Sequence, residues 1–348
     1  MGKYTAIDDP SAYFQVKLWT GNAGTNAITL DGNSDMQPDF MWHKEQNDTN
    51  GWHQFDSSRG VTKYLATQST GAEGTFGGYL TSFDSNGFTA NYGDSSMNSN
   101  GTAQCSWMWH SNGGTTVSNT NGSITSTVQA NQDAGFSIVT YTTAGSTATI
   151  GHGLGAKPDV ILLKKRNGAI SWYVRHVSTG TSYLNLNLTS AAVSNPAATW
   201  TTTEPTTSVY SIGTSTDFNI SGGEYVAYCF AEKQGYSKFG KYTGNGSPNG
   251  PFIYTGFKPA FVMVKKSNNT GSWVINDSKR IGYNPNNYDL YANLGAAEED
   301  NDRFDLLSNG FKARSTSSPS NASGDTYIYM AFAENPFVTS TGIMGTAR

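Results

Sequence analysis

The stretch that decides the fold reads FKPAFVMVKK at residues 257–266, and two close counterparts of it occur earlier in the chain. They read MQPDFMWHK at residues 36–44 and AKPDVILLKKR at residues 156–166. A tryptophan follows the proline of each copy at one constant distance, in the pairs Pro38 and Trp52, Pro158 and Trp172, and Pro259 and Trp273. Two anchors that keep the same spacing in three places identify an internal repeat.

Each copy closes on an aromatic segment: CSWMW from Cys105, YVAYCFAE from Tyr225 and YIYMAFAE from Tyr327. We therefore predict three modules, here called repeats 1, 2 and 3, at residues 13–112, 134–233 and 234–336. The remaining segments are predicted to be an N-terminal arm at residues 1–12, a polar linker at 113–133 and a C-terminal tail at 337–348. Because almost no residues separate repeats 2 and 3, we expect a tight contact between them and a looser one after repeat 1.

The composition of the 348 residues favours an all-β protein. Charged residues make up 14% of the chain, against a usual share of about 25%, while Gly numbers 39, Tyr 19 and Phe 17. Helix-favouring residues are scarce, and Asn-Gly pairs such as Asn86–Gly87 and Asn309–Gly310 supply turn residues. We predict that each repeat is a two-sheet β-sandwich with a jelly-roll or lectin-like topology, with a short helix around residues 288–299.

Within a repeat, the strand pattern indicates burial on both faces. In residues 261–266 the apolar side chains Phe261 and Met263 fall on one face, and Val262 and Val264 fall on the other. A strand that is apolar on both sides is typical of a central strand covered from both directions. We therefore expect this segment to lie in the middle of its sheet.

Charge and apolar patterning exclude two classes of partner. The net charge of −4 argues against nucleic acid, because phosphate binding needs clustered Lys and Arg. No apolar run approaches the length of a membrane span, and the N-terminus lacks the pattern of a signal peptide. Cys105 and Cys229 lie in aromatic strand-like segments, so we interpret both as buried free thiols.

No constellation of catalytic residues emerges from the sequence, so we expect neither an enzyme nor a cofactor. The five histidines show no metal-ligand spacing, and no carboxylate pair suits a glycosidase. The matched pairs Asp56 with Arg59 and Asp277 with Arg280 are interpreted as structural ion pairs at strand ends. The acidic segment at residues 298–302 could hold calcium, although a solvated loop is the preferred interpretation, and the metal content stays undefined.

Tryptophans beside polar residues are the best candidates for ligand binding, because sugar rings stack on indole faces. The six candidates are Trp19, Trp42, Trp52, Trp172, Trp200 and Trp273. The three that recur in the repeats have an alternative role, in which each anchors the core of its own sandwich. The three that are specific to one repeat are the better candidates for a role at the surface.

Several longer stretches resemble one known family. They are TAIDDPSAYFQ from Thr5, SDMQPDFMW from Ser34, LTSFDSNGF from Leu80, HGLGAKPDVILLK from His152 and YIYMAFAENPFV from Tyr327. Together they resemble an uncharacterised family of virion structural proteins from marine tailed phages, over nearly the whole chain. The resemblance implies a tail-fibre-like particle component with β-sandwich repeats and no known catalytic site. This chain departs from the family pattern at residues 143–145, where repeat 2 reads TAG in place of the GNG of repeat 3.

The resemblance leaves three roles open. The first is a tail-fibre-like or knob-like appendage that contacts host surface polysaccharide. The second is a capsid decoration or cement protein, in which three modules in one chain mimic a trimer over a threefold position. The third, a polysaccharide-degrading tail enzyme, is disfavoured by the missing carboxylate pair. In each case we expect a virion protein that is made in the host cytoplasm, binds other virion proteins and forms an oligomer or part of a symmetric assembly.

Overall fold

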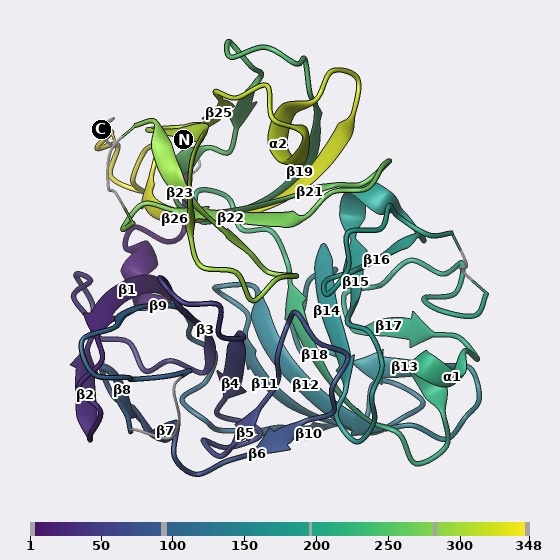
Figure 1. Ribbon diagram of the computed structural model, residues 1–348. Coiled ribbons are helices and arrows are strands. Elements are labelled where there is room, and N and C mark those ends of the chain that lie inside the picture. Colours follow the sequence, from purple (N-terminus) through teal and green to yellow (C-terminus); the bar gives the residue numbers. More distant parts are fainter. Residues whose placement is uncertain (1–3, 92–95, 195–196, 281–283, 345–348) are drawn as a thin grey trace.

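The computed structural model describes residues 4–91, 96–194, 197–280 and 284–344. Its regular secondary structure consists almost entirely of antiparallel strands (Figure 1). Each repeat supplies one large sheet, and the three sheets surround a common centre. The predicted all-β, sandwich-type fold is therefore confirmed. The few helical segments are single turns, such as α1 (Thr216–Asn219) and α2 (Ser318–Asn321).

Repeat 1 is a sandwich of an inner and an outer sheet. The inner sheet has the order β1 (Phe14–Thr20), β9 (Ala103–Trp109), β3 (Phe40–Glu45) and β4 (His53–Asp56). The outer sheet consists of β2 (Asn26–Thr29), β8 (Gly87–Ala90) and β7 (Leu80–Asp84), and β5 (Lys63–Tyr64) pairs with β6 (Gly74–Thr75). A single 3-10 turn, η1 (Pro10–Ala12), precedes β1.

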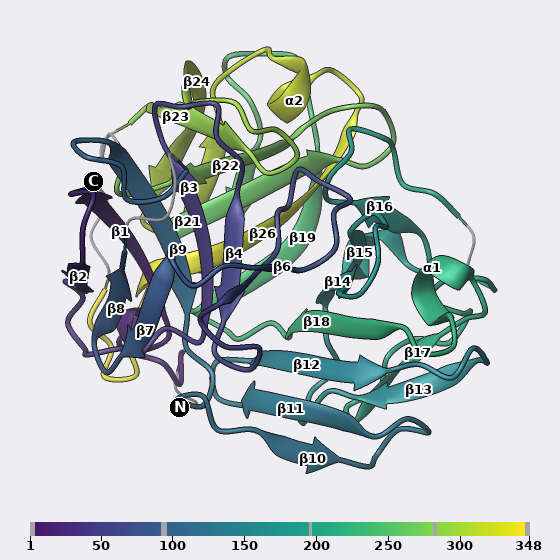
Figure 2. The same ribbon diagram turned by 60° about the horizontal axis from the view of Figure 1, so that its bottom comes forward.

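Repeat 2 follows the same plan with a wider inner sheet. Its order is β10 (Val117–Asn119), β11 (Ser126–Asn131), β12 (Phe136–Thr142), β18 (Glu224–Phe230), β14 (Val160–Lys165), β15 (Tyr173–His176) and β16 (Tyr183–Asn185). The outer layer is the pair β13 (Ala148–Gly151) and β17 (Val209–Ile212), and the turn η2 (Val177–Thr179) follows β15. Strands β10 and β11 lie within residues 113–133, so the prediction of a free polar linker there is wrong: Figure 2 shows both strands paired at the edge of this sheet.

Repeat 3 contributes one continuous sheet that curls over itself. Its order is β19 (Ser237–Thr243), β26 (Thr326–Pro336), β21 (Phe257–Lys266), β22 (Trp273–Asp277), β23 (Asn286–Tyr291), β24 (Glu299–Leu307), β25 (Gly310–Ala313) and β20 (Phe252–Tyr254). The helix expected at residues 288–299 is absent from this described segment, where β23 ends and β24 begins. No helix forms there because β23 pairs with both β22 and β24.

The three inner sheets turn one face toward a shared hydrophobic core. Three side chains in equivalent positions of the closing strands, Trp109, Phe230 and Phe332, contact one another in pairs with ring centroids 5.4 to 6.1 Å apart. The opposite face of each inner sheet packs on a separate core within its own repeat. This double coverage explains why segments such as Phe257–Lys266 are apolar on both faces and buried along their whole length. It also contradicts the looser contact expected after repeat 1, because residues of that repeat belong to the common core.

Candidate functional site

All six tryptophans proposed as ligand-binding residues lie inside the protein. Their residual exposure is 8% for Trp19, 3% for Trp273, 2% for Trp200, 1% for Trp42, and 0% for Trp52 and Trp172. A ring that is enclosed by protein offers no face on which a sugar can stack. The prediction that these residues bind a surface ligand is therefore wrong.

The three recurring tryptophans instead join the repeats to one another. The indole Nε1 of Trp172 in repeat 2 donates a hydrogen bond to the carbonyl oxygen of Ala66 in repeat 1, at 3.0 Å. That of Trp273 in repeat 3 donates to the carbonyl oxygen of Asn185 in repeat 2, at 2.9 Å. Trp52 in repeat 1 completes the cycle by donating to the carbonyl oxygens of Tyr291 and Leu294 in repeat 3, at 3.0 and 2.8 Å. The expected role as an anchor of each separate core is thus replaced by a contact between repeats.

A backbone hydrogen bond repeats at the same three boundaries. The amide of Glu73 in repeat 1 donates to the carbonyl of Arg166 in repeat 2, at 2.8 Å. The amide of Ala192 in repeat 2 donates to the carbonyl of Ser267 in repeat 3, at 2.8 Å, and that of Glu298 in repeat 3 donates to Gln46 in repeat 1, at 2.7 Å. All three acceptors lie eight positions after the recurring proline. The contacts therefore run in a closed cycle from repeat 1 to 2, from 2 to 3 and from 3 to 1, as between the subunits of a cyclic trimer.

Buried ion clusters reinforce two of the three boundaries. Between repeats 1 and 2, the fully buried guanidinium of Arg59 donates to the carboxylates of Asp56 and Glu73 and to the hydroxyl of Tyr228. Arg166 of repeat 2 pairs with the same Glu73 carboxylate at 2.8 Å. Because these groups lie on both repeats, the cluster fixes the position of one against the other.

The boundary between repeats 3 and 1 has a related cluster. Arg280 pairs with Asp277 at 2.7 Å and with Glu298 at 3.4 Å, and it lies over the ring of Trp107 in repeat 1. The indole of Trp107 donates to the Asp277 carboxylate at 3.2 Å. The structural interpretation of both Asp–Arg pairs agrees with these contacts, although the pairs act between repeats as well as at a strand end.

Repeat 2 has a histidine where the other repeats have this aspartate. The Nε2 atom of His176 lies 3.0 Å from the carbonyl oxygen of Tyr329 in repeat 3. Burial lowers the pKa of His176 to about 4, so the imidazole is neutral at pH 7 and donates to that carbonyl. A neutral hydrogen bond thus replaces an ion cluster at the third boundary.

Three buried lysines occupy equivalent positions at the ends of the central strands. The ammonium of Lys164 donates to the carbonyl oxygens of Thr70 and Ile170, and that of Lys265 donates to those of Thr189 and Ser190. Burial lowers the pKa of Lys265 to about 7 and those of Lys44 and Lys164 to about 8. The ammonium groups of Lys164 and Lys265 thus stabilise loops by hydrogen bonds to their carbonyl oxygens.

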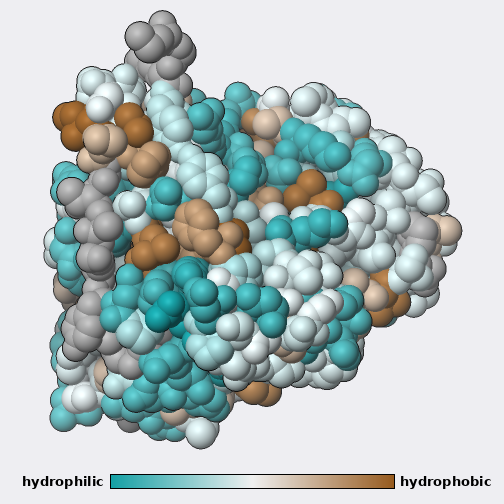
Figure 3. Space-filling view, turned by 90° about the horizontal axis from the view of Figure 1, so that it is seen from above, coloured by the Kyte–Doolittle hydropathy of each residue, from teal (hydrophilic) through white to brown (hydrophobic). Residues whose placement is uncertain are grey.

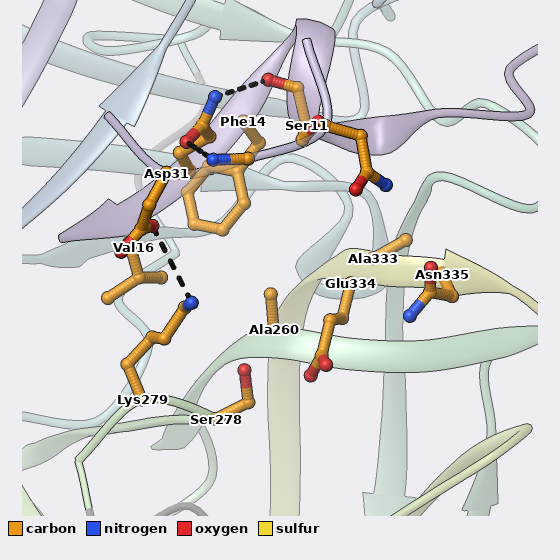
Figure 4. A pocket seen from close by; sticks show the side chains of 13 residues that line it. Ser11, Phe14, Val16, Asp31, Ala260, Ser278, Lys279, Ala333, Glu334 and Asn335 are labelled. Atoms are coloured by element: carbon orange, nitrogen blue, oxygen red, sulfur yellow. Dashed lines mark hydrogen bonds and ion pairs between the residues drawn. The ribbon is translucent and has the colours of Figure 1, made fainter. Parts of the chain in front are cut away.

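A cleft with a volume of about 340 Å³ lies between repeats 1 and 3 (Figure 4). One wall is the start of β1, with Phe14, Gln15 and Val16, together with the loop at residues 31–33. The other wall consists of Ala260, Ser278, Lys279, Ala333, Glu334 and Asn335. Figure 4 shows Asp31 reaching across to Lys279, 3.6 Å away, so an exposed ion pair closes one end.

The described residues offer no clear catalytic centre. They contain no group of three or more His, Cys, Asp or Glu side chains arranged to hold a metal ion. Within the acidic segment proposed for calcium, Glu298 pairs with Arg280 and Glu299 accepts from the hydroxyl of Tyr291. A Ser106–His43 contact of 3.0 Å exists, but both residues are fully buried and no substrate can reach them.

A family model for a domain of unknown function (DUF7483) matches residues 9–336. The chain belongs to this family. No curated protein and no solved structure matches it. The DUF7483 match covers all three repeats in a single domain, which agrees with a common core that the repeats build together.

Two further features of this DUF7483 chain concern its helices and its cysteines. Among the helices in the described ranges, none is both long and apolar enough to cross a membrane. Both cysteines are fully buried free thiols, which confirms their interpretation, and burial raises the pKa of each.

Proposed function

We propose that this protein is a non-enzymatic structural protein of a tailed-phage virion that acts as a single-chain equivalent of a trimer. The observation that supports the proposal most strongly is the backbone hydrogen bond that recurs at all three boundaries between repeats. A molecule with approximate threefold symmetry can present similar contacts to three equivalent sites at once. Capsids offer such sites at their threefold positions, which favours the decoration or cement role among the alternatives.

The face of the molecule above repeat 3 is compatible with this role. Figure 3 shows the face above repeat 3, where hydrophilic and neutral residues predominate and apolar residues form only small, separate areas. Such a surface suits a protein that stays soluble before it joins a particle. Docking by polar contacts at several equivalent positions then supplies the affinity that one weak contact lacks.

The decisive experiment is quantitative mass spectrometry of separated heads and tails from purified particles. A decoration protein should remain with tailless heads at hundreds of copies per particle. Recovery with tails alone would refute the decoration role and leave an appendage as the role within the virion. Absence from both fractions would refute the virion assignment as a whole.

A second candidate function, binding of host surface glycan by an appendage, is favoured by one exposed aromatic group. Phe252 and Tyr254 on the edge strand β20 are 46% and 52% exposed. Tyr254 borders a hollow of about 250 Å³ with Tyr4, Glu232 and Lys238, and the hydroxyls of the two tyrosines lie 2.8 Å apart. Aromatic rings next to charged and amide groups provide both the stacking and the hydrogen bonds that sugars require.

This candidate is tested by retention of the protein on host envelope polysaccharide. The variant Tyr254→Ala should abolish retention, whereas Phe76→Ala, which removes a 37% exposed ring elsewhere on the surface, should leave it unchanged. A lack of retention of the unmodified protein would refute glycan binding, and so would full retention of Tyr254→Ala.

A further inference from the structure

Strand β1 is an open edge of the inner sheet of repeat 1. In the described part of the chain its residues pair with β9 alone, from Phe14 opposite Trp109 to Thr20 opposite Ala103. The cleft of Figure 4 lies along the beginning of this strand. An edge strand presents unpaired backbone groups that can accept a further strand.

Repeat 2 shows what an occupied edge looks like. Its strand β12 corresponds to β1, because Phe136 lies opposite Phe230 just as Phe14 lies opposite Trp109. On the edge that is open in β1, strand β12 carries β11 in antiparallel pairing. The same structural position is thus filled in one repeat and open in another.

The side chain of Gln129 on β11 enters the position that corresponds to the cleft. Its Nε2 donates to the hydroxyls of Ser57 and Ser58, each at 2.9 Å. Its Oε1 accepts from the backbone amides of Asn112 and Gly114, at 3.2 and 2.9 Å. One carboxamide, fully buried, therefore satisfies three groups of repeat 1 and the amide of Gly114 just after it.

The residues around Gln129 correspond to residues that line the cleft. Ser57 and Ser58 occupy the places of Ser278 and Lys279, counted from the recurring proline. Asn112 occupies the place of Asn335, counted from the equivalent residues Trp109 and Phe332. Gln129 pairs with Ile138, whose counterpart in β1 is Val16, a residue of the cleft wall.

We propose that β1 accepts an extended peptide strand from a partner protein, antiparallel to β1, with a glutamine or asparagine opposite Val16 whose side chain enters the cleft. This strand reproduces on repeat 1 what β11 does on repeat 2. It adds backbone hydrogen bonds along β1 and covers Leu18, which is 36% exposed. The proposal does not depend on the virion assignment, since it rests only on the comparison of two repeats in one chain.

The rim of the cleft sets the preference for a neutral side chain at its centre. Lys17 and Lys279 both approach Asp31, at 3.1 and 3.6 Å, and Glu334 pairs with Lys258 at 2.9 Å. Because Glu334 is paired with Lys258 and the Asp31 carboxylate already serves two lysines, a cationic side chain would enter without a counterion. A carboxamide brings donor and acceptor groups without that cost.

The probe is a synthetic peptide with the sequence of residues 124–132, ITSTVQANQ, titrated into the full chain and followed by isothermal titration calorimetry. We expect saturable one-to-one binding with a Kd below about 1 mM. A peptide with Gln129→Leu should bind at least about tenfold more weakly, a loss that corresponds to about 1.4 kcal/mol. Hydrogen exchange of the β1 amides should slow in the presence of the first peptide.

Two matched variants of the protein locate the binding. Asn335→Trp places an indole in the mouth of the cleft and should abolish binding, whereas Asn112→Trp, at the equivalent position beside β11, should not affect it. Both positions are exposed, so each variant should fold, and Lys279→Trp provides a second block if Asn335→Trp does not. The proposal is overturned if the unmodified chain shows no saturable binding or if Asn335→Trp binds the peptide as well as the unmodified chain does.

Discussion

Replacement of Arg59 by methionine tests whether the buried clusters hold the repeats together. Arg59 is fully buried in side chain and donates to four partners: Asp56, Glu73, the carbonyl of Gln54 and the hydroxyl of Tyr228. Methionine preserves most of the aliphatic length but leaves the Asp56 carboxylate buried without a cation. Removing one partner of a buried pair costs about 3–5 kcal/mol, so unfolding by urea should begin at a distinctly lower concentration.

The matched control is Arg314→Met. Arg314 pairs with Asp305 at 3.3 Å, but its side chain is 42% exposed, and an exposed pair contributes only about 0–1 kcal/mol. The double variant Asp56→Asn with Arg59→Met should recover part of the loss, because it removes the unpaired carboxylate as well. Equal midpoints of urea unfolding for Arg59→Met and Arg314→Met would show that the cluster adds nothing to stability.

Two further predictions concern the recurring contacts. Trp172→Phe should destabilise the protein by about 1 kcal/mol more than Trp200→Phe in urea unfolding. Both variants remove the same atoms from buried rings, but only Trp172 donates its indole N–H, to the Ala66 carbonyl. Equal losses of stability would contradict the bridging role of Trp172. The buried lysines should make stability rise with pH between about 7 and 9, because their lowered pKa values mean that the unfolded chain binds more protons in this window. Lys265→Met should flatten this rise, measured as the unfolding midpoint at each pH, and an unchanged slope would show that Lys265 does not titrate there.

The strands and their burial could be predicted from the sequence, but the packing of the three repeats on one another could not. The apolar pattern of residues 257–266 correctly indicates a strand covered on both faces. That pattern does not say which part of the chain provides the cover. In this protein one face is covered by the same repeat and the other face by two different repeats, and a hydrophobic side chain is equally suited to both environments.

The contacts between repeats were hidden for a different reason. Glu73 and Glu298 have equivalent roles, since each pairs with the arginine of its repeat and donates its amide across a boundary. They lie at different distances from the recurring prolines Pro38 and Pro259, because the loops between them differ in length. An alignment of the repeats by spacing therefore cannot pair them, although the recurrence of the Asp–Arg pairs was a visible signal.

Strand β11 was missed because its side chains are mostly polar. Thr127, Gln129 and Asn131 alternate with Val128 and Ala130, and this composition is typical of a loop. The polar side chains still contribute to packing, since Gln129 hydrogen-bonds with the hydroxyls of Ser57 and Ser58 and with the amides of Asn112 and Gly114. The alternation with Val128 and Ala130 was the visible signal of a strand, but the Gly- and Asn-rich residues 111–123 just before it favoured a loop.

The comparison of the three boundaries explains what a single chain gains over a trimer of identical subunits. In a symmetric trimer every boundary must carry the same residues, so a cleft would be open or filled at all three places. Here one boundary has the Arg59 cluster and a cleft filled by Gln129, another has the Arg280 cluster and an open cleft, and the third has the neutral His176. The fold retains the cyclic contacts that it needs for stability, while each boundary can change separately. Among the described residues, the edge of β12 is filled by β11 while those of β1 and β19 are open, and this is the kind of asymmetry that the arrangement permits.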